Sequence, residues 1–209
     1  MKTRHLGLAD YHMTWEAMRA FTDERADDTE DELWVCEHPP VYTLGQAGRE
    51  SHIHNPADIP VVKSDRGGQV TYHGPGQVVV YTLISLRRAG FGIREMVERL
   101  ENSVIALLKM YDVTAVNRRD APGVYVNGAK IAALGLRVRR GSTYHGLALN
   151  INPDLAPFSG IDPCGFANLA VTSTEKLGIE SPKAQIVEQL ILELHKQLAA
   201  PVLDNSTLS

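Results

Sequence analysis

The chain has 209 residues, of which 44% are hydrophobic and 22% charged, and its formal net charge is −4 at pH 7. This composition is typical of one globular domain with a buried core, and the negative balance argues against a general nucleic-acid-binding protein. Two cysteines are too few for a disulfide framework, and no apolar run could span a bilayer or serve as a signal peptide, so a cytoplasmic protein is expected.

The first third of the chain predicts one helix and several strands. Asp10 is a typical N-cap for the helix that follows it. The apolar face of this helix is formed by Tyr11, Trp15, Met18 and Phe21. Short strands are predicted at 32–38 and 41–45, on either side of the Pro39-Pro40 break, and at 60–65 and 77–86.

The last two of these strands flank a glycine-rich loop, "RGGQVTYHGPGQ", from Arg66 to Gln77. Glycine loops can hold a phosphate with their backbone N–H groups, but neither the G-x-x-x-x-G-K-[ST] nor the G-x-G-x-x-G spacing occurs here. The alternative is a pair of tight turns whose glycines only supply positive φ. The loop alone leaves both interpretations open.

Apolar residues recur at helical spacing from Ile93 to Tyr111 and predict a second helix. Three antiparallel strands are predicted after it. Asn127-Gly128 is a strong hairpin turn sequence, and Arg140-Gly141 is a weaker one.

The second of these hairpins brings four small residues together on one side of the sheet. A two-residue loop at Arg140-Gly141 places Gly135 opposite Gly146 and Ala133 opposite Ala148. Strands normally fill such positions with larger side chains. The patch is therefore either an open slot for a slender ligand or a site where another backbone segment packs closely.

The last predicted helix begins at Ser181-Pro182, an N-cap followed by a proline in the first turn. Its apolar face carries Ile186, Leu190, Leu194 and Leu198. The tail after Pro201 is expected to fray. The fold class predicted from these elements is mixed α/β (α+β), as a single domain over residues 1–209.

Two residues could carry chemistry together. Cys164 lies in "DPCG", a constrained loop, whereas Cys36 has the strand setting of a small core residue. A thiol needs a partner to become a thiolate, and Lys130 could be that partner if it is partly buried. Otherwise Cys164 is an inert loop thiol and Lys130 an exposed strand end. Strict alternation places Lys130 on the side opposite Ala133 and Gly135, so this role requires a bulge or a position at the strand mouth.

The histidines are weaker candidates. His52 and His54 form an H-x-H pair without an evident third metal ligand, and surface roles are expected for them. His73 lies in the glycine loop, and His145 opens "HGLALN". Each of these two could orient a substrate or act as a structural hydrogen-bonding group.

The blocks "RGGQVTYHGPGQ", "APGVYV", "KIAALGLRV", "HGLALNI", "DPCG" and "VTS", in this order, resemble the bacterial octanoyltransferases of lipoate biosynthesis, also called lipoate–protein ligase B. The likeness runs from the first helix to about Glu175. It implies a fold like that of biotin protein ligases and lipoate ligases, in which a mixed sheet is flanked by helices. It also implies an enzyme that uses no metal and no cofactor.

In that family an octanoyl group passes from acyl carrier protein to a lysine of lipoyl domains, those of the 2-oxoacid dehydrogenase complexes and the glycine cleavage H protein. The resemblance makes Cys164 the residue that takes the acyl chain as a thioester, and Lys130 the residue that adjusts its proton. The implied substrate-binding residues are Arg66, Gly67, Gly68, Gln69, Val70, Thr71, Tyr72, His73, Ala133, Leu134, Gly135, Gly146, Leu147 and Ala148. Because carrier proteins are acidic, a local basic face with Arg137 and Arg139 is expected to bind them.

Three other functions are compatible with parts of the sequence. An ATP-dependent lipoate or biotin ligase of the same fold needs an adenylate site and no cysteine, so the "PCG" segment argues against it. A non-catalytic protein that binds acyl carriers would not require both Cys164 and Lys130. A metal hydrolase built on His52 and His54 is the most remote.

Overall fold

The computed structural model describes residues 1–162 and 169–199. The strands are β1 (Lys2–Leu8), β2 (Glu32–Glu37), β3 (Val41–Leu44), β4 (Val61–Lys63), β5 (Val70–His73), β6 (Gln77–Leu83), β7 (Val116–Asn117), β8 (Gly123–Val126), β9 (Ala129–Arg139) and β10 (Ser142–Asn150). The helices are α1 (Tyr11–Glu24), α2 (Leu86–Ala89), α3 (Ile93–Lys109) and α4 (Lys183–Ala199), with short 3-10 helices η1 (Glu50–His52) and η2 (Ala156–Gly160).

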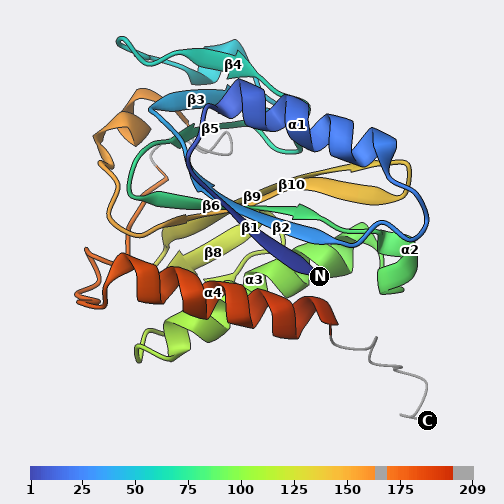
Figure 1. The fold of residues 1–209 in the computed structure, drawn as a ribbon. Coiled ribbons are helices and arrows are strands. Elements are labelled where there is room, and N and C mark those ends of the chain that lie inside the picture. Colours follow the sequence, from blue (N-terminus) through green and yellow to red (C-terminus); the bar gives the residue numbers. More distant parts are fainter. Residues whose placement is uncertain (163–168, 200–209) are drawn as a thin grey trace.

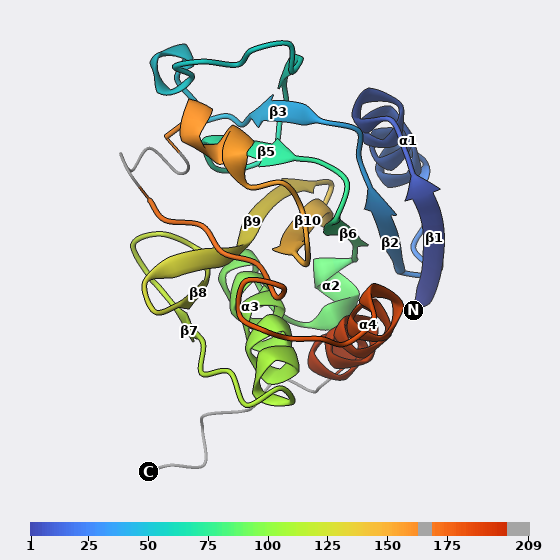
Figure 2. The same cartoon turned by 90° about the vertical axis from the view of Figure 1, so that its left-hand side faces the viewer.

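The strands form two sheets that face each other. The large sheet has the order β1-β2-β6-β10-β9-β8-β7, with β1 parallel to β2 and the other neighbours antiparallel. The small sheet has the order β4-β3-β5. The small sheet and α1 lie on one face of the large sheet, and α3 and α4 cover the other (Figures 1 and 2). This arrangement confirms the expected mixed sheet flanked by helices.

The helix side of the large sheet holds the larger part of the core. From α3 it buries Met96, Leu100, Val104, Leu107 and Leu108, and from α4 Ile186, Leu190, Leu194 and Leu198. These are the residues whose helical spacing predicted the two helices. Each fully buried aliphatic side chain of this kind stabilises the fold by about 1.5–3 kcal/mol.

The opposite side of the sheet is closed by α1. The side chain of Asp10 accepts a hydrogen bond of 2.9 Å from the N–H of Met13, which confirms the predicted N-cap. Met18 packs against the strands beside Cys36 and Tyr81. Cys36 is 3% exposed, and burial raises the pKa of its thiol to about 12, so it is the core residue that the sequence indicated.

Turn chemistry fixes the two hairpins. Asn127 and Gly128 have φ values of 49° and 82°, and Arg140 and Gly141 have 49° and 75°. Positive φ at both loop positions is the geometry of a two-residue turn that matches the twist of the strands. The predicted register is confirmed, with Gly135 opposite Gly146 and Ala133 opposite Ala148.

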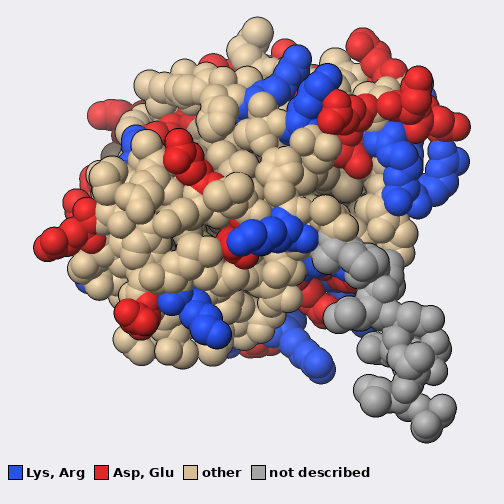
Figure 3. Space-filling model, turned by 60° about the horizontal axis from the view of Figure 1, so that its bottom comes forward, with Lys and Arg blue, Asp and Glu red and all other residues tan. Residues whose placement is uncertain are grey.

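The outer surface shows no preference for one charge on the face where α3 and α4 lie. Basic and acidic side chains are interspersed there among uncharged ones (Figure 3). Over the described ranges, none of the helices combines the length and the apolar character that crossing a membrane requires.

Candidate active site

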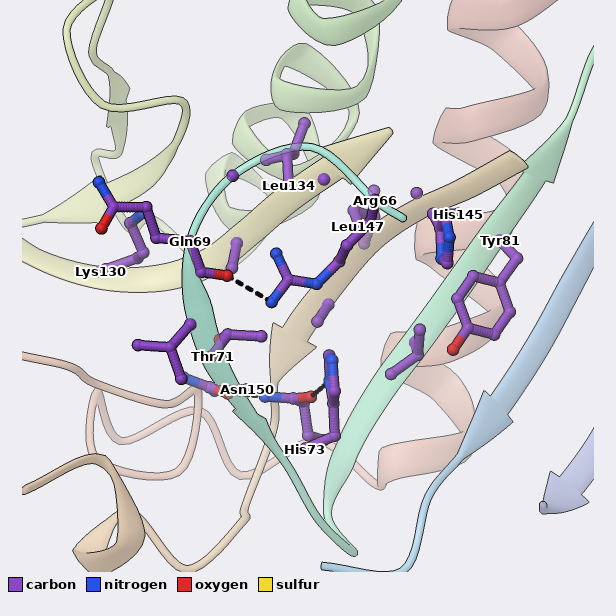
Figure 4. Close-up of a pocket in the computed structure, with 18 of the residues that line it drawn as sticks. Arg66, Gln69, Thr71, His73, Tyr81, Lys130, Leu134, His145, Leu147 and Asn150 are labelled. Carbon is purple, nitrogen blue, oxygen red and sulfur yellow. Dashed lines mark hydrogen bonds between the residues drawn. The ribbon is translucent and has the colours of Figure 1, made fainter. Parts of the chain in front are cut away.

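A cavity lies between the two sheets, beneath the glycine loop. Its empty volume is about 750 Å³ with the open mouth included. Its floor is formed by β6, β9 and β10, and its roof by the loop and β5. Lys130 and Gln69 lie at one end of it and Tyr81 and His145 at the other (Figure 4).

A β-bulge turns Lys130 into this cavity. Tyr125 pairs with Lys130 and Val124 with Ala132, so Ile131 is an extra residue in β9. Ile131 and Ala132 consequently both point into the helix-side core. Lys130 then shares the cavity face with Ala133, which resolves the alternation problem in favour of the bulge.

The ammonium of Lys130 is held inside the protein. The side chain is 4% exposed, and Nζ donates a hydrogen bond of 3.2 Å to the carbonyl of Pro122. Nζ also lies 5.2 Å from the ring centre of Tyr125, within the range of a cation–π contact. A Cβ at Gly123 would lie only 3.0 Å from Cε and 3.2 Å from Nζ, so glycine at that position leaves room for the lysine head.

The backbone of Lys130 is bonded to the segment that follows Cys164 in the chain. Its N–H donates to the carbonyl of Ala170 at 2.8 Å, and its carbonyl accepts from the N–H of Thr172 at 3.0 Å. Val171, between them, lines the cavity. Cys164 itself lies outside the described residues.

Arg66 holds the glycine loop in shape. Its side chain donates to the carbonyl of Thr43 at 2.5 Å, to that of Gln69 at 2.7 Å and to that of Gly67 at 2.9 Å. A buried guanidinium that donates to several carbonyls fixes a loop that has little side-chain packing of its own. Arg66 therefore shapes the roof of the cavity and also lines it.

The glycines of the hairpin admit close backbone packing, although they line the cavity. A Cβ at Gly135 would lie 2.9 Å from the carbonyl oxygen of Gly67, and one at Gly146 would lie 2.1 Å from that of Val80. The Gly67 N–H also donates to the carbonyl of Leu136 at 2.9 Å. At Gly135 and Gly146 the small residues therefore allow another backbone segment to pack closely. The open part of the cavity lies beside Ala133 and Ala148.

Substituting Ala133 with valine is expected to shorten the usable cavity. The sequence resemblance implies an octanoyl chain as the ligand of this cavity, and each methylene of such a chain contributes about 0.8 kcal/mol when buried, so lost room for two or three of them is expected to lower octanoyl use roughly ten- to fiftyfold. Hexanoyl donors are expected to suffer less. The measurement is the ratio of kcat/KM for octanoyl over hexanoyl donors, in variant and parent.

Gly135→Ala is the matched control. Its added methyl group would displace the loop at Gly67, so both donors are expected to slow without a change in their ratio. An unchanged ratio in Ala133→Val would mean that Ala133 does not face the acyl chain.

A chain of hydrogen bonds joins the glycine loop to the large sheet. His73 Nδ1 donates to Gln77 Oε1 at 2.6 Å, and Gln77 Nε2 donates to Asn150 Oδ1 at 2.9 Å. Asn150 Nδ2 continues the chain to the carbonyl of Thr172 at 3.0 Å. Burial lowers the pKa of His73 to about 3, so the ring is neutral and serves as a structural donor.

Most of the residues expected to bind substrate line the cavity together. They are Arg66, Gly68, Gln69, Val70, Thr71, His73, Ala133, Leu134, Gly135, Gly146, Leu147 and Ala148, with Lys130 beside them. Gly67 lies against the backbone of Leu136 and Tyr72 packs in the apolar cluster around Tyr42, and neither is part of the lining.

His145, one of the two histidines that could orient a substrate, also lines the cavity. Further lining residues were not expected from the sequence as substrate contacts: Tyr11, Gln77, Val79, Tyr81, Asn150, Phe158 and Val171. Period-two alternation places Val79 and Tyr81 on one side of β6, but it does not say which side faces a ligand.

The other candidates have separate partners. His54 Nε2 lies 2.9 Å from a carboxylate oxygen of Asp162, and in the described part of the chain no group of three or more histidine, cysteine or acidic residues could hold a metal ion. Arg139 forms an ion pair with Asp23 of α1 at 2.5 Å, and Arg137 donates to Gln46. The carrier-docking role expected for these arginines stays a prediction, in which Asp23 already offsets part of the charge.

Comparison with known proteins gives a consistent set of matches. A family model described as the lipoyl protein ligase A/B catalytic domain matches residues 10–195. An octanoyltransferase of Laribacter hongkongensis is 55% identical over 201 residues, covering 96% of this chain and 97% of that protein. A bipartite lipoate protein ligase from Thermoplasma acidophilum superposes with a TM-score of 0.73 at 15% identity, covering 95% of this chain and 84% of the other. Biotin protein ligase from Aquifex aeolicus gives a TM-score of 0.60 at 10% identity, covering 95% and 69%.

Proposed function

We propose a reaction for this chain as a member of the lipoyl protein ligase A/B catalytic-domain family, within which it is an octanoyltransferase of protein lipoylation. It loads the octanoyl group from acyl carrier protein onto Cys164. It then passes this group to a lysine of a lipoyl domain. Membership in this family confirms the resemblance of the sequence motifs. The observation that supports the route through Cys164 best is the bulge that turns Lys130 into the cavity beside the segment following that cysteine.

In the first half-reaction, the Cys164 thiolate attacks the carbonyl carbon of the octanoyl thioester, and the sulfur of the carrier leaves as a thiol with the proton that the Lys130 ammonium gives up, which leaves Lys130 neutral. One thioester replaces another, so the step is nearly balanced in free energy and needs no ATP. A Lys130 ammonium close to the sulfur favours the thiolate by opposite charge.

In the second half-reaction, the amine of the acceptor lysine attacks the Cys164 thioester, and the thiolate leaves. Neutral Lys130 accepts the proton that the amine loses, as a general base. An amide replaces a thioester, and this makes the second step effectively irreversible. Both substrates are carried by proteins, and the Thermoplasma ligase, solved as part of a system with its E2 lipoyl domain, supports a lipoyl domain as acceptor.

Incubation with octanoyl-acyl carrier protein, without nucleotide and with a chelator present, is expected to add one octanoyl group to the protein. Intact-mass measurement followed by peptide mapping would locate it on Cys164. A lipoyl domain added afterwards should take the group up at the same rate at which the adduct disappears. A requirement for ATP, or turnover without any adduct, would favour an adenylating ligase or a direct transfer instead.

A further inference from the structure

One side chain at the inner end of the cavity has no role in the scheme above. His145 is 1% exposed and lines the cavity, next to Tyr81 and far from Lys130 (Figure 4). Its Nε2 donates to Asp65 Oδ1 at 2.9 Å. Its Nδ1 is buried and has no hydrogen-bond partner among the described residues. Buried polar atoms are normally satisfied, so an unpartnered one inside a ligand cavity indicates a missing partner.

The backbone is strained to place this ring. His145 has a φ of 59° within strand β10, a conformation that costs a non-glycine residue free energy. Regular alternation would direct His145 to the helix-side core with Leu147 and Leu149. Instead the ring stacks on that of its neighbour Tyr144, with centroids 5.0 Å apart at 28°. The strained residue therefore brings an imidazole to the cavity face of the sheet.

Asp65 decides which nitrogen of the ring carries the proton. Its carboxylate accepts from Trp15 Nε1 at 2.7 Å and from the Tyr144 hydroxyl, besides His145. Burial by itself would raise the pKa of Asp65, but the hydrogen bonds from His145 and Tyr144 hold it at about 2. Burial lowers the pKa of His145, and its ring is neutral at pH 7. Nε2 thus bears the hydrogen, and Nδ1 presents a lone pair.

Among the described residues, two donors that line the cavity already have acceptors of their own. The Tyr81 hydroxyl donates to His38 Nε2 at 2.6 Å, because His38 Nδ1 already donates to the carbonyl of Ala9. The guanidinium of Arg66 donates to loop carbonyls. The rest of the cavity between Lys130 and His145 is mainly apolar, with Ala133, Leu134, Leu147 and Ala148 among its lining.

We propose that the inner end of the cavity is a hydrogen-bond-accepting subsite, in which His145 Nδ1 binds a hydroxyl group on the distal carbons of the acyl chain. This inference rests on the proposed acyl transfer, since it names a class of donor for the same cavity: medium-chain acyl groups with a terminal hydroxyl. A purely apolar end would instead reject a hydroxyl, because burying one without a partner is strongly unfavourable.

The test compares two donors that differ in one terminal group. 8-Hydroxyoctanoyl and nonanoyl thioesters of acyl carrier protein have the same chain length and differ only by hydroxyl against methyl. For the wild-type protein the ratio of their kcat/KM values is expected to lie within about threefold of one, since a hydrogen bond replaces that to water. An apolar end would lower the ratio roughly ten- to hundredfold, and that outcome overturns the subsite.

His145→Phe removes the acceptor and is expected to lower the hydroxyl-to-methyl ratio at least tenfold, with nonanoyl transfer serving as its internal reference. His5→Phe, on an exposed strand, is the matched control and should leave the ratio unchanged. An unchanged ratio in His145→Phe overturns the proposal.

If His145→Phe does not fold, the wild-type protein still gives the answer. With ¹⁵N-labelled histidine, the two acyl-enzymes should differ at one imidazole nitrogen, and identical spectra overturn the subsite. Absence of any octanoyl adduct on the wild-type protein would be a different failure. It would overturn the proposed function, and the subsite with it, whereas normal octanoyl transfer with exclusion of the hydroxyl donor would overturn the subsite alone.

Discussion

Replacement of Cys164 by alanine is expected to abolish octanoyl transfer and to leave no covalent adduct after incubation with octanoyl-acyl carrier protein. The physical reason is that the proposed reaction has no route without the sulfur, since the first half-reaction forms a bond to that atom and the second breaks it. The loss should reach the detection limit of the assay. The measurement combines turnover with intact mass, and circular dichroism should show an unchanged fold.

Cys36 provides the matched control in the same chain. It is buried in β2, and burial raises the pKa of its thiol to about 12, which leaves essentially no thiolate at neutral pH. Cys36→Ala should therefore keep the adduct and most of the turnover, with a small loss of stability from the missing sulfur. Substantial turnover in Cys164→Ala would refute the thioester route.

Lys130→Met is expected to lower kcat by about 10²–10⁴-fold, the usual contribution of a general acid–base group. Methionine retains most of the side-chain volume over the Tyr125 ring, so the loss would reflect the ammonium and not a cavity. Lys130→Arg keeps the charge but cannot act as a base, because a guanidinium stays protonated. It is expected to load Cys164 but to transfer the octanoyl group slowly.

Single-turnover kinetics separate these two steps. The rates of adduct formation and of adduct transfer to a lipoyl domain should be measured across pH for Lys130→Met, Lys130→Arg and the parent. A mild loss with an unchanged pH dependence would remove Lys130 from the chemistry. It would leave the buried lysine as a structural residue that donates to the Pro122 carbonyl.

Residues from several parts of the chain position Lys130. Its Nζ donates a hydrogen bond to the carbonyl of Pro122, and its backbone forms hydrogen bonds with Ala170 and Thr172. Gly123 leaves room for Cε and Nζ. Such a lysine is positioned by contacts from parts of the chain before and after it. The sequence identified Lys130 as a candidate, but it could not indicate in which direction the side chain points.

Local chemistry made several features predictable. The turns at Asn127-Gly128 and Arg140-Gly141 need positive φ values that few sequences favour, so both turns, and the register of the second hairpin, followed from the residues alone. The helices α3 and α4 followed from the spacing of apolar residues, because one face of each must be buried. Strand β1 was not predicted, since most of its residues are exposed and its stability comes from parallel pairing with β2.

The sequence by itself thus determined both hairpin turns, the register of the second hairpin, the long helices, the family and many of the residues that line the cavity. The tertiary structure decided which way individual side chains point. The bulge at Ile131 is fixed by pairing with β8 and by hydrogen bonds to the segment after Cys164, and the left-handed backbone of His145 is held by Asp65, which directly precedes the glycine loop. Local periodicity predicts neither feature, because each departs from regular strand geometry and is stabilised only by residues distant in the sequence.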